Sequence, residues 1–563
     1  MEEIIINLLK KSTGLTEEEI SNLIEIPPNP ELGDYAFPCF VLSSKLKKSP
    51  QEIAQSLVDK IKFSKEIDKI QAQGPYINFF LNSQELAEAT IKKIQKEKEK
   101  YGSAKMKEKV LIESPGPNTN KPLHIGHARN IILAQSIKKL LEFLGKDVKI
   151  VDIINDRGAH ICKSMIAYEK FGKGNTPEKA EKKSDHFVGD YYVKFSEELK
   201  KNPKLDEEVH ECLRKWESGD KDTLELWKKM NNWALQGFKE TYNKFNLKID
   251  KTYCESEIYK LGKEIILEQF KKGTIDKKKD GAYFADLTSQ GLGEKILLRG
   301  DGTSIYITQD LYLAILRKKE YNFDKLIYVV ANEQNHHFKT LFTLLKLFGY
   351  KWADKLYHLN YGLVHLESGR LKSREGNIVD ADDTIEITKN LALEEINKRY
   401  KDLSQKEKES RAMQIAMSAI RYFFLKIDRL KDLTFIPQES LSFEGNTGPY
   451  LLYTYARARS ILKKAKYTNK KAYKIKEISN MEKQLTFHVA RFPQIVLHSY
   501  RNLSPNIIAN YAYQIAKIFN ELYHTDRILG SENEQFKLVL VDSFSQVLKN
   551  ALSLLEIDTI DKM

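Results

Sequence analysis

The pattern of hydrophobic and polar positions changes character twice along the chain. The first hundred residues contain an amphipathic helical segment, QEIAQSLVDKI, and a strand-like segment, QGPYINFFL, followed by a charged helical pattern over Ile91–Lys109. From Val110 strand-like and helical patterns alternate, and after about residue 395 nearly every segment has helical periodicity. We therefore expect a small α+β N-terminal domain (1–103), an α/β domain (104–395) and an all-α C-terminal domain (396–563).

The alternating region carries the clearest fold signal. VLIE (Val110–Glu113) predicts a strand, a long helical pattern ends at Gly145, and VKIVDII (Val148–Ile154) predicts the next strand. This strand–helix–strand order is typical of a parallel, doubly wound, Rossmann-type sheet. Between about residues 165 and 250 charged helical sequence replaces the alternation, which resumes at LIYVV (Leu326–Val330). The pattern therefore predicts an α/β Rossmann-type domain with a helical insertion.

Composition narrows the class of protein only a little. The chain has no apolar run of about 18 residues and no signal-like start, so we expect a cytoplasmic protein without a membrane segment. The net charge of +13 favours a polyanionic partner, although a lysine-rich surface explains it equally well. No Cys-x-x-Cys pair exists, so neither a zinc site nor a disulfide framework is indicated; the four cysteines are Cys39, Cys162, Cys212 and Cys254.

One strand-to-helix turn carries an unusual set of polar residues. It reads SPGPNTNKPLHIGHARN (Ser114–Asn130). A helix N-terminus presents free N–H groups and a positive dipole end, which suit phosphate, and His124 and His127 can donate to phosphoryl oxygens. Gly126 leaves room for a flat base. Four residues alone fit solvated or capping histidines as well, but the preceding strand, the following helix and Lys121 favour an ATP-binding crevice.

The turn resembles a known signature. His124-Ile125-Gly126-His127 is similar to the HIGH motif of class I aminoacyl-tRNA synthetases, and GRLKSREGN (Gly369–Asn377) loosely resembles their KMSKS loop. Further segments resemble the arginyl-tRNA synthetase family in order: INDRGAHICKSM, DHFVGDYYVKF, YCESEIY, DGTSIYITQDL, YVVANEQNHHF and FEGNTGPYLLYTYAR. GDYAFP and GPYINF are similar to that family's additional N-terminal tRNA-binding domain, and the helical C-terminal region to its anticodon-binding domain.

The resemblance implies ATP-dependent ligation of L-arginine to tRNA-Arg, with Mg²⁺ arriving on ATP and no dedicated protein metal site. It implies ATP contacts from His124, Gly126, His127, Arg370, Lys372 and Ser373. Ser373 stands where the signature has its second lysine, and the family's upstream lysine, here Lys121, is expected to supply that charge. We therefore expect catalytic roles for Lys121, His124, His127, Lys372 and Arg374. Pro115-Gly116 also departs from the family's usual Ser-Ser.

The chemistry of arginine recognition agrees with the matching segments. A guanidinium group needs carboxylates for its fork and gains from an aromatic face. Tyr306 and Asp310 stand at i and i+4, so they share one face if helical. The resemblance implies that Asp310 and Glu255 hold the guanidinium and that Tyr306 stacks on it. It also assigns Asn118 and Gln334 to the α-amino and carboxylate groups of arginine.

Candidate RNA contacts combine aromatic and basic residues, because unpaired bases stack on aromatic rings while cations meet the backbone. By resemblance we expect tRNA contacts at Tyr450, Tyr453, Arg457 and Tyr523 in the C-terminal domain, and at Tyr76 and Asn78 in the N-terminal domain. Many of the C-terminal tyrosines have helical spacing and equally fit core packing, and Asn78 equally fits a strand edge. Family habit suggests a monomer.

Two other functions remain open from the sequence. A catalytically degenerate, synthetase-like tRNA-binding protein would fit the altered loop at Ser373, but the complete histidine turn and arginine set oppose it. A different class I synthetase or nucleotidyltransferase would lack a reason for the combination of Tyr306, Asp310 and Glu255. Binding of arginine but not lysine or cysteine would separate these alternatives.

Overall fold

A parallel sheet of five strands forms the centre of the molecule. A computed structural model describes residues 2–172, 174–366, 380–468 and 473–561. Neighbouring strands of the sheet are all parallel, in the order β11-β10-β4-β5-β6. The strands are β4 (Lys109–Glu113), β5 (Asp147–Ile154), β6 (Lys251–Cys254), β10 (Lys325–Ala331) and β11 (Leu356–Tyr361). The chain order reverses between β4 and β10, so the predicted doubly wound, Rossmann-type topology is confirmed.

The helix that follows β4 is covered on both sides. α6 (Ile125–Phe143) packs against β4, β5 and β10 on one side and against α16 (Gln405–Lys426) and α22 (Glu534–Leu554) on the other. Even polar residues of α6 are buried, such as Arg129, whose guanidinium donates to four backbone carbonyls. The start of α6 is therefore fixed by both the sheet and the C-terminal helices.

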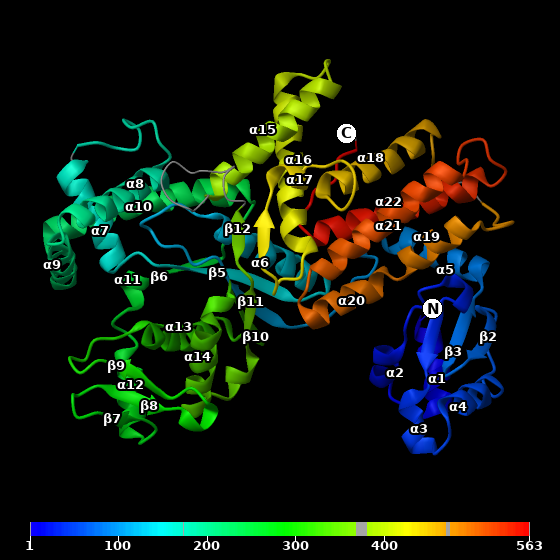
Figure 1. The fold of residues 1–563 in the computed structure, drawn as a ribbon, viewed down its shortest axis with the longest axis horizontal. Coiled ribbons are helices and arrows are strands. Elements are labelled where there is room, and N and C mark those ends of the chain that lie inside the picture. Colours follow the sequence, from blue (N-terminus) through cyan, green and yellow to red (C-terminus); the bar gives the residue numbers. More distant parts are fainter. Residues whose placement is uncertain (1, 173, 367–379, 469–472, 562–563) are drawn as a thin grey trace.

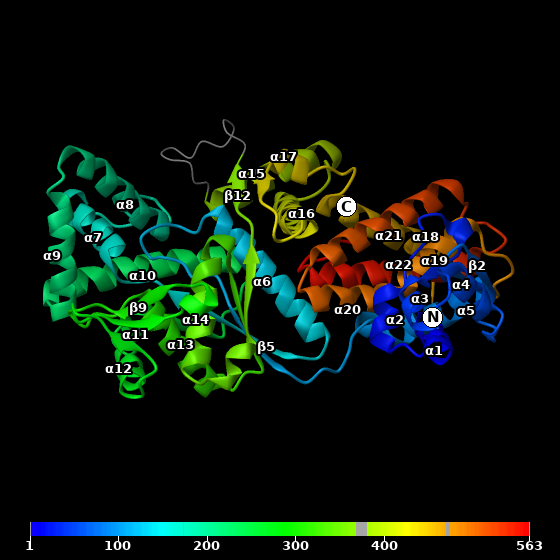
Figure 2. The same cartoon turned by 60° about the horizontal axis from the view of Figure 1, so that its bottom comes forward.

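The predicted helical insertion lies between β5 and β6 and begins slightly earlier than expected. Figures 1 and 2 show it on the opposite side of the molecule from the C-terminal helices. Gly189 of the insertion faces the turn before α6: a Cβ there would lie 2.8 Å from Cδ of Pro122. The insertion thus rests directly on the segment that carries Lys121. Its helices are α7 (Ala159–Phe171), α8 (Ser184–Lys201), α9 (Leu205–Ser218) and α10 (Lys221–Lys244).

Small sheets complete the α/β region. A three-stranded antiparallel sheet follows β6 and two short helices, and β12 (Val364–Leu366) pairs in parallel with β13 (Leu433–Phe435). The sequence pattern does not indicate the strands of the antiparallel sheet or β13, because two to five residues are too short to show a period. The other elements are α11 (Glu255–Ile258), α12 (Lys263–Lys271), β7 (Asp276–Lys277), β8 (Tyr283–Asp286), β9 (Glu294–Leu298), α13 (Tyr306–Tyr321) and α14 (Asn335–Leu347).

The N-terminal domain is α+β, as predicted. Its sheet has the order β1-β3-β2, formed by Tyr35–Pro38, Tyr76–Leu81 and Ile67–Gln73. The expected helix over Ile91–Lys109 is wrong in its second half: α5 (Ser83–Glu97) ends early, and residues 101–108 have no helix or strand. The helix stops where Lys98 takes a left-handed φ of +49°, and after a short 3₁₀ turn Gly102, with φ +89°, turns the chain again. The domain's other helices are α1 (Glu2–Thr13), α2 (Glu17–Leu23), α3 (Phe40–Leu46) and α4 (Pro50–Val58).

The C-terminal region is helical, as predicted, and α5 packs against it through α19 and α22. The domain boundary expected at residue 395 falls inside α15 and stays a prediction. Across the described parts of the chain no helix combines the length and the apolar character that crossing a bilayer requires. The remaining helices are α15 (Ala381–Arg399), α17 (Pro437–Ser440), α18 (Gly448–Lys464), α19 (Asn480–Ala490), α20 (Phe492–Asn502) and α21 (Asn506–Thr525).

Candidate functional site

The candidate site residues gather beyond the carboxyl ends of the parallel strands. Asn118 follows β4, Glu255 follows β6 and Gln334 follows β10. The segments after β4 and β5 lie side by side, because Asn118 and Asn155 form a parallel bridge and Asn155 N–H donates to the Pro117 carbonyl at 3.0 Å. Ligands of doubly wound sheets bind at this edge, where the strand order reverses.

The two histidines of the turn are held by backbone bonds. His124 is the N-cap of α6, and its Nδ1 accepts from Gly126 N–H at 3.1 Å. Nδ1 of His127 accepts from His124 N–H at 3.1 Å, and the two ring centroids lie 3.9 Å apart. A neutral imidazole that accepts at Nδ1 carries its proton on Nε2. Each ring therefore offers an Nε2–H donor.

Burial keeps both rings neutral. Desolvation, together with the nearby Lys121 cation, lowers the pKa of His124 to about 4. Desolvation and the charges of His124 and Lys121 lower the pKa of His127 well below its usual value. Burial also lowers the pKa of Lys121 itself. The turn thus combines two neutral donors with one desolvated ammonium group, an arrangement suited to a polyphosphate.

Gly126 has a direct steric role. A Cβ at this position would lie 2.9 Å from Cε1 and Nδ1 of His124, so a side chain would displace the ring. Its absence lets the His124 ring fold back over the start of α6. The expected contact of Gly126 with a flat base stays a prediction.

The KMSKS-like residues Arg370, Lys372, Ser373 and Arg374 lie outside the described residues. The chain that follows them is placed against the histidine turn: Ala381 N–H donates to the Leu123 carbonyl at 2.8 Å, and His124 and Asp380 form an antiparallel bridge. Asp380 is also the N-cap of α15. The described chain that begins at Asp380 is therefore anchored beside the turn.

Three of the five residues expected to bind arginine lie at the beginnings of two helices, Glu255 in α11 and Tyr306 and Asp310 in α13. Tyr306 and Asp310 lie one turn apart at the beginning of α13, as expected, and the Tyr306 side chain is 66% exposed. Asp310 Oδ2 lies 2.7 Å from Nε2 of His337, a partner that the sequence analysis did not identify. Gln334 is exposed and Asn118 half-buried. The ANEQNHHF segment already contained His337, but its role depends on a contact that only the fold creates.

Glu255 is the most buried acid of the set. It is 3% exposed, and its Oε2 has no hydrogen-bond partner among the described residues. Desolvation raises its pKa to about 7, against the opposing effect of the Arg157 cation. A buried carboxylate oxygen without a partner is costly, so this atom is prepared to accept a hydrogen bond from a ligand.

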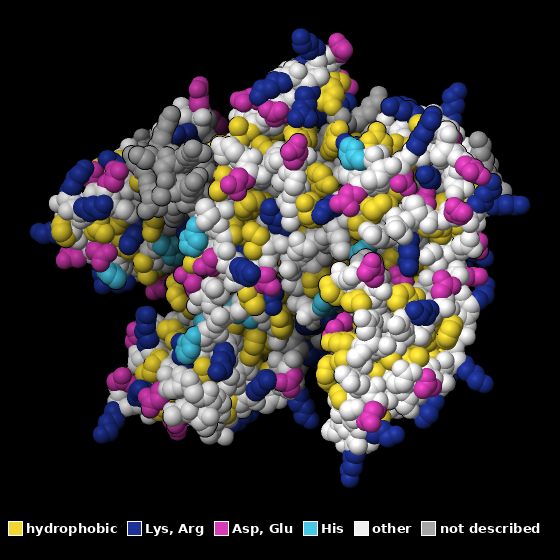
Figure 3. Space-filling model, turned by 45° about the vertical axis from the view of Figure 1, so that its right-hand side comes forward, with side chains coloured by type: hydrophobic (Ala, Val, Ile, Leu, Met, Phe, Trp, Pro, Cys, Tyr) yellow, Lys and Arg dark blue, Asp and Glu magenta, His cyan; other side chains and the backbone are white. Residues whose placement is uncertain are grey.

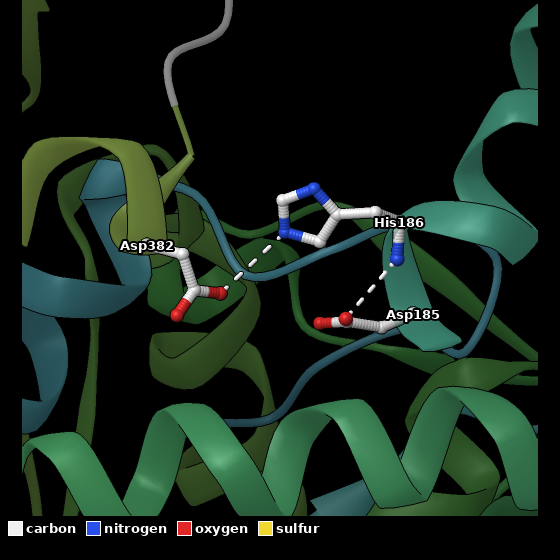
Figure 4. Close-up of side chains that lie close together, drawn as sticks. All are labelled: Asp185, His186 and Asp382. Carbon is white, nitrogen blue, oxygen red and sulfur yellow. Dashed lines mark hydrogen bonds and ion pairs between the residues drawn. The ribbon is translucent and has the colours of Figure 1, made fainter. Parts of the chain in front are cut away.

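A second cluster of titratable groups joins the insertion to α15. Figure 4 shows Asp185 and His186 of α8 opposite Asp382 of α15. These three residues have the spacing of a metal site, but the oxygens of Asp382 already accept from Lys183 and Lys244, each at 2.7 Å. Two ammonium groups occupy the positions that a cation would need. The cluster is therefore an ion-pair network and does not fit a metal ion.

Three protein-family models match successive parts of the chain. The model "tRNA synthetases class I (R), catalytic domain" matches residues 90–436, "DALR anticodon binding domain" matches 451–563, and "Arginyl tRNA synthetase N terminal domain" matches 1–81. The chain belongs to the arginyl-tRNA synthetase family. Its relatives include an arginine–tRNA ligase of Treponema denticola, 44% identical over 96% of this chain and 94% of that protein, and one of Borrelia duttonii, 41% identical over 99% and 97%.

Solved structures of the arginyl-tRNA synthetase family share the whole architecture. The Thermus thermophilus arginyl-tRNA synthetase superimposes with a TM-score of 0.84 at 27% identity, covering 100% of this chain and 99% of that one. The Plasmodium falciparum enzyme has a TM-score of 0.80 at 23% identity, covering 100% and 98%. The predicted three-part fold is thus confirmed over the full length.

The DALR region of this arginyl-tRNA synthetase homologue carries an exposed aromatic and basic pocket. The guanidinium carbon of Arg457 lies 4.8 Å from the Tyr453 ring centroid and 4.9 Å from that of Tyr523. A pocket of about 610 Å³ surrounds this stack, and its other charged or aromatic lining residues are Arg399, Tyr400, Lys401, Asp402, Arg411, Lys464 and Asp561. The hydroxyl of Tyr450, on α18, instead accepts a hydrogen bond from Asn520 Nδ2 on α21. Tyr455 and Tyr511, two other tyrosines of the C-terminal helices, are buried, as the core-packing alternative predicted for many of these tyrosines.

The N-terminal domain offers a smaller aromatic surface. The rings of Tyr76 and Phe40 meet edge to face at 5.8 Å, and Phe40 is 53% exposed. Asn78 lies in the central strand β3, is 4% exposed, and donates to Gln73 Oε1 at 3.3 Å. On the face shown in Figure 3, Lys and Arg side chains are scattered among acidic ones. The aromatic surface, more than charge, marks this domain as a candidate RNA contact.

Proposed function

We propose that this protein is an arginine–tRNA ligase, which joins L-arginine to tRNA-Arg through an arginyl-adenylate and releases AMP and pyrophosphate. One observation carries the proposal: the histidine turn follows β4 and Glu255 follows β6 at the same edge of the parallel sheet, with Asp310 near Glu255, in a chain whose relatives are named arginine–tRNA ligases along nearly their whole length. The turn suits a nucleotide polyphosphate and the acids suit a guanidinium group.

Activation of arginine would use groups that keep their charge. An oxygen of the arginine carboxylate attacks the α-phosphorus of ATP, a new carboxylate–phosphorus bond forms, and the bond to pyrophosphate breaks. The Nε2–H groups of His124 and His127 are suited to donate to the phosphoryl oxygens as negative charge grows on them. Since burial holds both rings neutral, they act as fixed dipoles and exchange no proton.

The remaining charge on the triphosphate would be met by Lys121 together with Lys372 and Arg374. Mg²⁺ accompanies ATP in such reactions and neutralises the outer phosphates. We assign no described residue as its ligand, because the cluster around Asp382 is already filled by two ammonium groups. In the second step the 2′-hydroxyl of the terminal adenosine attacks the carbonyl carbon of the adenylate, and AMP leaves.

Selection of arginine would rest on shape as well as charge. Asp310 and Glu255 approach from two helices and can engage both edges of a guanidinium fork, with the exposed face of Tyr306 stacked on it. Asn118 and Gln334 would hold the α-amino and carboxylate groups. Lysine carries a single ammonium group and would leave buried acceptors unpaired, which penalises it strongly.

Contacts with tRNA-Arg would come from both ends of the chain. The pocket around Tyr453, Arg457 and Tyr523 is suited to stacked bases of the anticodon loop, with Tyr450 supporting it. Tyr76 would contact the outer part of the tRNA, and Asn78, being buried, would act there through its neighbours. We also propose that the enzyme acts in the cytoplasm as a monomer.

Aminoacylation of tRNA-Arg with radiolabelled arginine tests this function. We expect charging that depends on ATP and Mg²⁺, with labelled lysine or cysteine giving no product. A catalytically degenerate tRNA-binding protein would bind tRNA-Arg in a filter assay and yet form no arginyl-tRNA. That result would replace the proposal with the tRNA-binding alternative.

A further inference from the structure

Arg157 places a second guanidinium group beside the candidate arginine pocket. It lies in the turn between β5 and α7, within the INDRG segment, and its side chain is 11% exposed. No local sequence pattern assigns it a role. Its position matters because the same turn connects the parallel sheet to the helical insertion.

The guanidinium group of Arg157 is held by groups from two other elements. Its carbon lies 3.9 Å from the ring centroid of Tyr259, which follows α11, and 5.2 Å from that of Trp216 on α9. Nη2 donates to Glu217 of α9 at 2.6 Å, and Nη1 lies 3.7 Å from Oε1 of Glu255. Stacking, a charged hydrogen bond and an ion pair together leave this cation little freedom.

The two carboxylate oxygens of Glu255 have different surroundings. Oε1 faces Arg157, whereas Oε2 is buried and has no hydrogen-bond partner among the described residues. A carboxylate between a resident cation and an open acceptor position can bind a second guanidinium at the free oxygen. Without the resident cation, a side chain only 4% exposed would favour its neutral form and would bind a cation poorly.

We propose that Arg157 is a positioning residue for arginine recognition: it keeps Glu255 ionised and fixes Oε1, so that Oε2 accepts from the substrate guanidinium. This inference rests on the proposed function. It also gives the insertion a purpose in the active site, because Trp216 and Glu217 of α9 hold Arg157 in place.

The charges around Glu255 predict a pH signature. Arg157 and the nearby side-chain amide of Gln309 oppose the protonation of Glu255, whereas Asp156 and Asp310 favour it, and the phenol of Tyr306 lies close by. Burial dominates and raises the pKa of Glu255 to about 7. The ionised form is therefore gained as the pH rises through about 7, so arginine affinity of the wild-type protein should increase over the same range. Removal of the Arg157 cation should move this rise to higher pH.

The test measures the arginine KM by ATP–pyrophosphate exchange, with saturating ATP and tRNA-Arg, between pH 6 and 9. Arg157→Met should raise the arginine KM at pH 7 by about fivefold to tenfold, as expected for a tenfold weaker ionisation of Glu255. The difference should fall below about twofold at pH 9, where Glu255 ionises in both proteins. Arg157→Lys retains a cation and should restore most of the wild-type pH profile.

Arg214→Met on α9 is the matched control, because Arg214 is 73% exposed and, among the described residues, its side chain bonds to Glu211 of its own helix alone. Its arginine KM should follow the wild type at every pH. A KM for Arg157→Met that is unchanged, or raised equally at all pH values, overturns the inference, as does a wild-type KM that does not fall between pH 6 and 8. Absence of arginine-dependent exchange in the wild type would instead overturn the proposed function.

Discussion

At the scale of single residues, the candidate site depends on protonation states that burial imposes. His124 and His127 accept backbone hydrogen bonds at Nδ1 and are neutral at physiological pH, so they present fixed Nε2–H donors. Burial moves the pKa of Glu255 in the other direction, up to about 7, which again favours the uncharged form, and the Arg157 cation opposes this shift. Donors for phosphate and acceptors for guanidinium are thus separated by environment as well as by position.

We predict that His124→Ala lowers kcat about 10²- to 10³-fold, the usual effect of removing one transition-state donor, with little change in the arginine KM. Because the pKa of His124 is about 4, the wild-type kcat should show no histidine titration between pH 6 and 8. Steady-state aminoacylation over this range checks both statements. A bell-shaped kcat profile centred near pH 6.5 would contradict the neutral-donor assignment.

Asp310→Asn should raise the arginine KM about 10- to 100-fold, since a charged hydrogen bond contributes about 1.5–3 kcal/mol. The ATP KM should change little, because Asp310 is assigned to the guanidinium group of arginine and not to the phosphates. Asp354→Asn is the control: Asp354 is 75% exposed and pairs with Lys346 on the surface. Equal KM values for the two variants would remove Asp310 from the arginine pocket.

At the scale of elements, the sequence predicted those helices and strands in which buried and exposed residues alternate regularly. The strands β4, β5 and β10, the helix after β4, the insertion and the C-terminal helices follow the strand-like or helical patterns of the sequence, whereas β6, with one buried residue in four, was not predicted. The strands β7–β9 were not predicted, because each has only two to five residues. The helix predicted over Ile91–Lys109 was too long, because lysines and glutamates continue a helical composition past Gly102. Pairings such as Arg157 with Glu255, or His337 with Asp310, join elements far apart in sequence, so no local pattern could reveal them.

The network around Asp382 gives a prediction at this scale. Asp382→Asn would leave the partly buried Lys244 without its carboxylate and Lys183 with Asp185 alone, at a cost of about 3–5 kcal/mol in the free energy of unfolding. Because the start of α15 lies against the histidine turn, activity should fall as well. Chemical denaturation and aminoacylation measure the two effects. Asp383→Asn, at the exposed neighbouring position, is the control, and equal stability of both variants would contradict the account.

At the scale of the whole molecule, the catalytic sheet lies between the insertion and the C-terminal helices, with the N-terminal domain beside those helices (Figure 1). The insertion shapes the site through Gly189, Asp185 and Trp216, whereas the C-terminal helices support α6 from behind. A tRNA that reached both the pocket around Arg457 and the sheet edge would have to extend along the molecule, so anticodon contacts and chemistry should be separable by mutation.

Arg457→Ala should raise the KM for tRNA-Arg about 10-fold, in line with the 1–3 kcal/mol of a stacked base, and leave the arginine KM unchanged. Lys517→Ala is the control for general loss of positive charge, because Lys517 is 63% exposed on the same helix as Tyr523. Steady-state charging with tRNA varied and arginine saturating measures the effect. Equal effects of the two substitutions would show that Arg457 contributes charge only.

The most direct test of the central claim is ATP–pyrophosphate exchange by the purified wild-type protein in the presence of tRNA-Arg, with arginine and lysine compared. We predict exchange that requires arginine, is absent with lysine, and falls when Lys121 is replaced by alanine. Absence of arginine-dependent exchange with a tRNA-Arg of proven acceptor activity would contradict the account, because the histidine turn and the acids at the sheet edge would then not form a working site.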